Sequence, residues 1–139
     1  MIQMNFFAEN LLIIPLISFI VTVIIKGILI KINTGKIEIS KSLWSWGMPS
    51  VHSAVVVSLA TAMAWKHWIL SDEFALAITM TVIIIYDAIN VRYEAWLHAT
   101  AINKILWTEK FKELLWHLPS EAFAWSIVWV VVATVLYHL

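Results

Sequence analysis

The connector between the first two long apolar runs of this chain leads into the second run through the segment Trp46-Gly47-Met48-Pro49-Ser50-Val51-His52-Ser53-Ala54. Glycine and proline interrupt the preceding structure, and serine is among the residue types preferred at a helix N-cap. The segment therefore predicts a tight loop that opens directly into a helix at residue 51. It also places a histidine in the first turn of that helix.

The chain on either side of this segment has the composition of a membrane protein. Its 139 residues are 62% hydrophobic and 13% charged, with a mean hydropathy of +0.88. A soluble domain is about 45–50% apolar and about 25% charged. The formal net charge is zero, which gives no indication of a nucleic-acid partner, and the absence of cysteine excludes disulfides and thiolate chemistry.

Four apolar runs are long enough, or nearly so, to cross the hydrocarbon core, which needs about 20 residues. We predict an all-α, integral membrane bundle of about four transmembrane helices plus one or two interfacial helices, in a single domain covering 1–139. The expected spans are residues 8–32, 51–69, 72–90 and 119–138. The polar connectors 33–50 and 91–118 then lie on one face of the membrane, and the second has the spacing of amphipathic helices that continue out of the membrane or lie along it.

Two residues of the first run mark it as unusual. Pro15 is expected to kink the helix or to mark its true start. Lys26 is costly within a membrane unless it snorkels, pairs or faces a polar cavity. Lysine and arginine concentrate in the two connectors, so the positive-inside rule places that face in the cytoplasm, in what we expect to be the plasma (inner) membrane.

A histidine lies at or just after the end of each connector, at His52 and His117, and an acid, Glu121, follows the second histidine by four residues. Two histidines, an acid, a serine and several cations on one face suit phosphoryl transfer. One imidazole can attack phosphorus while a carboxylate orients it, and the other can protonate the leaving oxygen. Cations and helix-start N–H groups can hold the equatorial oxygens.

Three ordered blocks resemble a known family. They are Gly47-Met48-Pro49-Ser50-Val51-His52-Ser53-Ala54, Tyr86-Asp87-Ala88-Ile89-Asn90-Val91-Arg92, and Lys112-Glu113-Leu114-Leu115-Trp116-His117-Leu118-Pro119-Ser120-Glu121. The chain is similar to the type 2 phosphatidic acid phosphatase superfamily, which includes vanadium haloperoxidases, and more closely to its small divergent membrane branch. With a lysine that ends the first span, the resemblance covers nearly the whole chain.

The resemblance implies a membrane lipid phosphate or diphosphate phosphatase that works through a phosphohistidine, without metal or other cofactor. It implies His117 as nucleophile, Glu121 as its orienting acid and His52 as general acid. It also implies Ser50, Lys112 and Arg92 as phosphate ligands, and we add Lys26 and Asp87 to the predicted phosphate-binding residues. The expected partners are a lipid phosphate substrate and the membrane; the sequence carries no signal for an oligomeric state.

Other interpretations remain open at this level. The arginine that precedes the nucleophile in the superfamily is not matched here, where only Lys110 and Lys112 precede His117. A non-catalytic protein that binds or transports phosphate headgroups is therefore the alternative function. Asp87 and Arg92 could simply pair with each other. A zinc site is a weak interpretation, because the spacing of histidines and acids lacks a ligand cluster.

Nine tryptophans against three glycines are a further anomaly. In the blocks that resemble the family, tryptophan stands where glycine or another small residue is expected at Trp46, Trp96, Trp116, Trp125 and Trp129. Such replacements at helix contacts overpack them by about 1–3 kcal/mol each. We interpret these positions as glycines encoded by UGA and translated here as tryptophan. A lipid-facing aromatic belt is the alternative, and UGG codons at these positions would exclude recoding.

Overall fold

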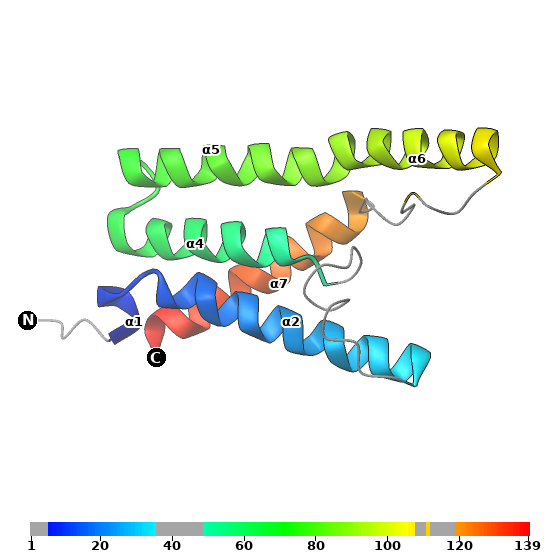
Figure 1. Ribbon diagram of the computed structural model, residues 1–139. Coiled ribbons are helices and arrows are strands. Elements are labelled where there is room, and N and C mark those ends of the chain that lie inside the picture. Colours follow the sequence, from blue (N-terminus) through cyan, green and yellow to red (C-terminus); the bar gives the residue numbers. More distant parts are fainter. Residues whose placement is uncertain (1–5, 36–48, 108–110, 112–118) are drawn as a thin grey trace, which may run out of the picture.

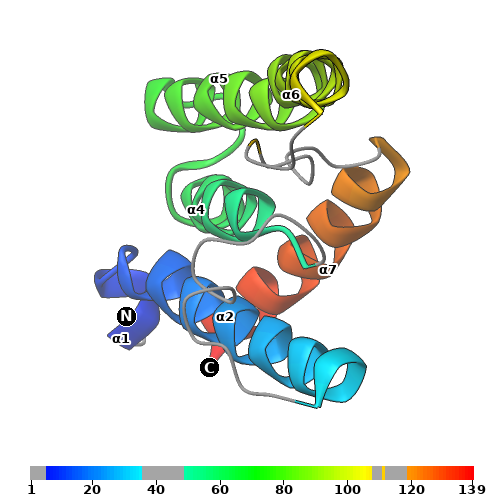
Figure 2. The same ribbon diagram turned by 45° about the vertical axis from the view of Figure 1, so that its right-hand side comes forward.

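The computed structural model describes residues 6–35, 49–107, 111 and 119–139, and all secondary structure within them is helical. The predicted all-α class is confirmed. The helices are α1 (Phe6–Glu9), α2 (Ile13–Thr34), α4 (Val51–His67), α5 (Asp72–Tyr86), the π-helix η1 (Asp87–Val91), α6 (Arg92–Leu106) and α7 (Pro119–His138). Figures 1 and 2 show α2, α4, α5 and α7 as a bundle in which α4 occupies the centre.

The first apolar run is divided into two helices. A short α1 ends at Glu9, and α2 begins at Ile13, so that Pro15 falls in the first turn of α2. A proline is tolerated in a first turn because the N–H groups there have no intrahelical acceptor. Pro15 therefore marks the start of the long helix rather than a kink within it. Gly35 ends α2 with a φ of 72°, the left-handed cap that glycine adopts at little cost.

The central helix α4 contacts α2, α5 and α7. Its buried face carries small side chains at helical spacing, Ala54, Ser58 and Ala62, which let neighbouring backbones approach closely. The Ser58 hydroxyl donates to the carbonyl of Ala54, four residues earlier, which satisfies this polar group inside the bundle. Small residues on α4 thus take the place that glycine often holds in membrane bundles.

The helices α5, η1 and α6 form one continuous helix from Asp72 to Leu106. At 1.5 Å per residue its 35 residues span roughly 52 Å, well beyond a hydrocarbon core of about 30 Å. The α6 part extends past the rest of the bundle (Figure 1). The segment after residue 90 therefore continues the helix that precedes it, without a break between Asp72 and Leu106.

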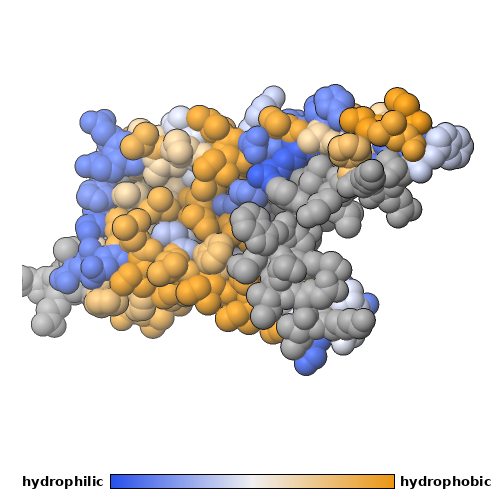
Figure 3. Space-filling view, viewed as in Figure 1, coloured by the Kyte–Doolittle hydropathy of each residue, from blue (hydrophilic) through white to orange (hydrophobic). Residues whose placement is uncertain are grey.

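Two helices among the described residues are long and apolar enough to cross a membrane, Ile13–Thr34 and Asp72–Leu106. The apolar segment Ala122–His138 is shorter, and α4 has 17 residues. Hydrophobic side chains cover the middle of the bundle in Figure 3, and hydrophilic ones gather at the end that carries the α4–α5 turn. This distribution fits a helical bundle held in a membrane.

The tryptophans fall into unlike environments. Trp129 is 1% exposed, packs against Ala54 and Val57, and has a buried indole N–H for which the described residues offer no acceptor. Trp68 and Trp107 are exposed and end α4 and α6 with φ angles of 75° and 48°. Neither arrangement is typical of tryptophan, since a buried indole N–H usually finds a partner and a left-handed helix end usually holds glycine. Trp46 and Trp116 lie outside the described residues.

Candidate functional site

The predicted loop-to-helix segment places Ser50 and His52 at the start of α4. Ser50 is the N-cap: its side-chain oxygen accepts a hydrogen bond from the Ser53 N–H at 3.3 Å, and the residue is 2% exposed. This contact satisfies one of the N–H groups that a helix start leaves without an intrahelical acceptor. It also fixes His52 in the first turn, where it is half-buried.

A hydrogen bond joins His52 to the long helix across the bundle. Nη2 of Arg92 lies 3.0 Å from Nε2 of His52. A guanidinium has only donors, so Nε2 must be the acceptor. The imidazole is therefore neutral in this arrangement, with its proton on Nδ1. The contact brings together two residues that are 40 positions apart in the sequence and that the sequence analysis assigned to the same site.

Asp87 pairs with the same arginine. Nε of Arg92 lies 3.4 Å from Oδ2 of Asp87, and the two side chains are 19% and 48% exposed, respectively. Asp87, Arg92 and His52 therefore form one connected cluster, which we call the His–Arg–Asp cluster. The interpretation that Asp87 and Arg92 pair is confirmed, but the pair also reaches the histidine.

The π-helix η1 explains how the cluster is assembled. Residues five apart lie about 140° apart around a regular α-helix. In η1 the Arg92 N–H bonds to the Asp87 carbonyl five residues earlier, and this turn brings both side chains to the same face. Short π-helical turns inside α-helices occur frequently at functional sites. The sequence analysis did not predict this turn, because no residue pattern distinguishes one π turn from a continuing α-helix.

Lys26 lies on the inner face of α2. It continues a stripe at four-residue spacing that begins with Ile14, Ser18 and Thr22, and all four residues are buried. Its relative exposure is 5%, so the lysine does not extend to the outer surface of the bundle. The lysine is therefore buried in the bundle, and its 5% exposure does not fit a side chain that snorkels to the interface.

Asn103 is a residue to which the sequence analysis gave no role. Its side chain is 7% exposed and makes two hydrogen bonds to the backbone of Phe111. Nδ2 donates to the Phe111 carbonyl at 2.8 Å, and the Phe111 N–H donates to Oδ1 at 3.1 Å. This two-point contact ties Phe111, which precedes His117 by six residues in the sequence, to α6. The side-chain amide of an asparagine can pair with both the N–H and the carbonyl of one residue, as a backbone group would. The residue with which Asn103 pairs can be identified only in the folded structure.

The remaining predicted residues fall outside what the structure describes. These are His117, Lys112 and the side chain of Glu121. The helix α7 starts at Pro119, after Lys112 and His117, and contains Glu121. Figures 1 and 2 place that start at the same end of the bundle as the start of α4 and the junction of α5 with α6. Two helix starts, which favour anions, thus lie at the end that carries the His–Arg–Asp cluster.

The described part of this site offers hydrogen-bond donors and one imidazole rather than a metal centre. Within the described residues, no group of three His, Cys, Asp or Glu side chains could hold a metal ion. A guanidinium beside a neutral imidazole at a helix start is suited to an anion with several oxygens, such as a phosphate. The fold defines a helical-bundle membrane protein that carries the His–Arg–Asp cluster near one end.

Comparison with known proteins agrees with this class. A family model described as "Divergent PAP2 family" matches residues 7–132, and the chain belongs to that family. It is 33% identical over 147 residues to the "Uncharacterized membrane protein YuiD" of Bacillus subtilis (strain 168), covering 88% of this chain and 92% of that protein. No solved structure matches. The resemblance carried by the three sequence blocks is thereby confirmed at the level of the family.

Proposed function

We propose that this protein is a membrane phosphatase that hydrolyses a lipid phosphate or diphosphate through a phosphohistidine intermediate. The observation that carries the proposal is the Arg92–His52 hydrogen bond at the start of α4, supported by Asp87. It places the Arg92 guanidinium, a donor suited to phosphate oxygens, next to the His52 imidazole, which can act as an acid or a base. Membership in a phosphatase-related family supports the same reaction class.

The proposed reaction has two balanced steps. His117 attacks phosphorus, a P–N bond forms, the P–O bond to the lipid breaks, and His52 gives a proton to the leaving oxygen. Water then attacks the phosphohistidine, the P–N bond breaks, and His52 takes the proton of the water. Glu121 orients His117 throughout. Ser50, Lys112, Arg92 and Lys26 hold the phosphate oxygens, while Asp87 holds Arg92.

The cluster suggests how His52 is prepared for the first step. Without substrate, its Nε2 accepts from Arg92 and therefore carries no proton. A phosphate offers Arg92 a charged acceptor, which makes stronger hydrogen bonds than a neutral imidazole. When Arg92 turns to the phosphate, Nε2 becomes available, and the nearby negative charge favours the protonated imidazole. Substrate binding itself thus produces the general acid.

A phosphate-release assay tests this function in purified protein supplied with phosphatidate in mixed micelles and a chelator. We expect phosphate release by the parent protein, no release by His117→Ala, and a loss of about 10²–10⁴-fold for His52→Ala, the usual contribution of a general acid. Arg92→Lys should lose about tenfold or more, because one bidentate donor is replaced by a point charge. His67→Ala, at the exposed far end of α4, is the matched control and should retain full activity.

Equal release by the parent and His117→Ala would exclude the phosphohistidine. The alternative function is binding or transport of phosphate headgroups without turnover, favoured by the lack of an arginine before His117. In that case phosphatidate would bind to the parent protein and its binding would weaken in Arg92→Lys, while no protein released phosphate. The assay therefore separates the two functions.

The site end is proposed to face the cytoplasm across the plasma (inner) membrane. The chain lacks cysteine, so single cysteines report topology without background. Lys104→Cys lies on α6 at the site end, and Asp72→Cys lies at the start of α5 at the other end. A membrane-impermeant maleimide should label Asp72→Cys in intact cells and Lys104→Cys only after permeabilisation. The reverse pattern would place the site outside.

A further inference from the structure

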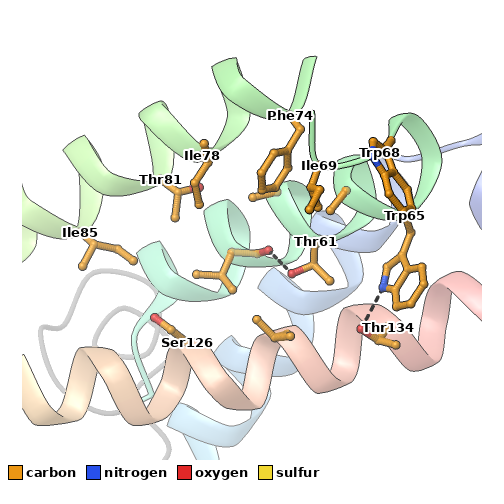
Figure 4. A pocket seen from close by; sticks show the side chains of 14 residues that line it. Thr61, Trp65, Trp68, Ile69, Phe74, Ile78, Thr81, Ile85, Ser126 and Thr134 are labelled. Carbon is orange, nitrogen blue, oxygen red and sulfur yellow. Dashed lines mark hydrogen bonds between the residues drawn. The ribbon is translucent and has the colours of Figure 1, made fainter. Parts of the chain in front are cut away.

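An apolar groove runs along the outside of α4 between α5 and α7. Its volume is about 620 Å³, within the range of small-ligand sites, roughly 300–1,000 Å³. Figure 4 shows Phe74, Ile78 and Ile85 of α5 facing Ser126 and Thr134 of α7 across the groove, with Thr61 of α4 behind them. The described residues show few contacts between α5 and α7, so α4 forms its floor.

The few polar groups in the groove are engaged by the protein itself. Three hydroxyls donate to backbone carbonyls of their own or a neighbouring helix, and a fourth oxygen accepts from an indole N–H. These contacts are Thr61 to Val57 at 2.8 Å, Thr81 to Val56 at 3.1 Å, Ser126 to Ala122 at 2.7 Å, and Trp65 Nε1 to Thr134 at 3.1 Å. Apart from the indole of Trp68, every other lining side chain is apolar. The groove therefore suits a hydrocarbon better than a hydrated or polar ligand.

The groove leads toward the His–Arg–Asp cluster. Along α5 it extends from Phe74 to Ile85, a rise of roughly 17 Å. Ile85 precedes Asp87 by two residues, so one end of the groove lies within roughly 3 Å of the cluster along the helix axis. The other end is bounded by Trp65, Trp68 and Phe74, close to the α4–α5 turn. An amphiphile with an anionic head at the cluster would lay its chain along this groove.

We propose that the groove holds an acyl chain of the phospholipid whose phosphate binds at the His–Arg–Asp cluster, an inference that rests on the proposed function. The volume and length give a mean cross-section of roughly 40 Å², whereas an α-helix of 10 Å diameter occupies roughly 80 Å². An extended hydrocarbon chain fits within this cross-section, whereas a helix from a second copy would have to lie partly outside the groove. The lipid class selected is therefore a long-chain phosphate ester whose chain shares the bilayer with the protein.

Filling the groove tests this assignment. Ala64 lines it and is half-buried, so Ala64→Phe places a ring where the chain would lie, and Ala64→Val is a milder filling. Ala75→Phe is the matched control, because Ala75 is exposed on α5 and does not line the groove. Melting temperatures establish that all three variants fold. Two readouts follow: dioleoyl phosphatidate retained by the protein in native mass spectrometry, and phosphate release from dioleoyl against dibutyryl phosphatidate.

We expect Ala64→Phe to lose lipid retention and to lower kcat/KM for the dioleoyl ester about tenfold or more, with the dibutyryl ester unaffected and Ala64→Val intermediate. Ala75→Phe should match the parent. Unchanged dioleoyl retention and turnover in Ala64→Phe would overturn the groove assignment while leaving the phosphatase intact. If the parent protein retained dioleoyl phosphatidate, Ala64→Phe lost it and neither released phosphate, the groove assignment would stand and the proposed phosphatase function would be overturned. Loss of a dimer with lipid retention unchanged would assign the groove to a second copy and overturn the proposal.

Discussion

Trp68 ends α4 in a backbone conformation that side chains rarely adopt, with φ 75° and ψ 152°. This region of conformational space is essentially restricted to glycine, and a residue with a side chain held there costs about 1–3 kcal/mol. Trp107 ends α6 with φ 48° and ψ 47°, the left-handed position at which helices most often place glycine. Two exposed tryptophans thus occupy backbone positions suited to glycine, in addition to those noticed in the sequence.

Trp68→Gly is therefore expected to stabilise the protein by about 1–3 kcal/mol, because glycine removes the strain. Thermal unfolding in detergent measures the change. Trp65→Gly is the control in the same helix: Trp65 donates to Thr134 and stacks with Tyr137, so its removal should destabilise. A lower melting temperature for Trp68→Gly would contradict the account. We also expect the coding sequence to have UGA, rather than UGG, at the codons for Trp68 and Trp107.

Trp129 is a buried tryptophan at a position where the sequence blocks lead us to expect a small residue. It fills the contact between α4 and α7, yet its indole N–H has no acceptor among the described residues. A buried donor without a partner costs about 1–3 kcal/mol. Glycine at this position would remove that cost and let α7 approach Ala54 and Val57 more closely. The recoding of these tryptophans remains a prediction that the codons decide.

At the scale of elements, the π-helix η1 and the Asn103 contact arrange the site. The π turn sets Asp87 and Arg92 on one face, opposite His52. Asn103, three turns further along α6, fixes the chain at Phe111. The long helix from Asp72 to Leu106 therefore acts as a rigid support. It carries Asp87 and Arg92 of the His–Arg–Asp cluster at one point and the Asn103 contact to Phe111 at another.

Asn103→Leu tests this supporting role, because leucine keeps the size and removes both hydrogen bonds to Phe111. These two part-buried hydrogen bonds contribute about 1 kcal/mol each, so we expect kcat for phosphate release to fall about tenfold or more. Retention of phosphatidate should change little, since the groove is untouched. Lys104→Ala, the exposed neighbour, is the control and should keep the parental kcat. A parental kcat in Asn103→Leu would show that the contact does not position the nucleophile.

At the scale of the whole molecule, the sequence predicts what local chemistry determines. Ser50 and Ser71 are both observed as N-caps, as their residue type and position indicate. The α-class, the membrane character and the family likewise follow from composition and from three ordered blocks. These features depend on composition and on residues close together in the chain, so they can be predicted from the sequence.

What the sequence does not reveal depends on distant contacts. Three features can be recognised only in the packed bundle. They are the π turn that joins α5 to α6, the burial of Lys26 and the Asn103–Phe111 contact. Arg92 could be predicted as a phosphate ligand, but its hydrogen bond to His52 crosses 40 residues. The apolar groove arises because α5 and α7 diverge over α4, and a pattern of apolar residues does not encode that divergence.

The most direct test of the central claim is capture of the phosphohistidine. The purified protein would be mixed with phosphatidate labelled in its phosphate and quenched in alkali, which preserves the P–N bond, before peptides are sequenced by mass spectrometry. The account predicts label on His117 in the parent protein, none in His117→Ala, and turnover of the label as phosphate appears. Phosphate release without labelled histidine, or labelling that persists in His117→Ala, would contradict it.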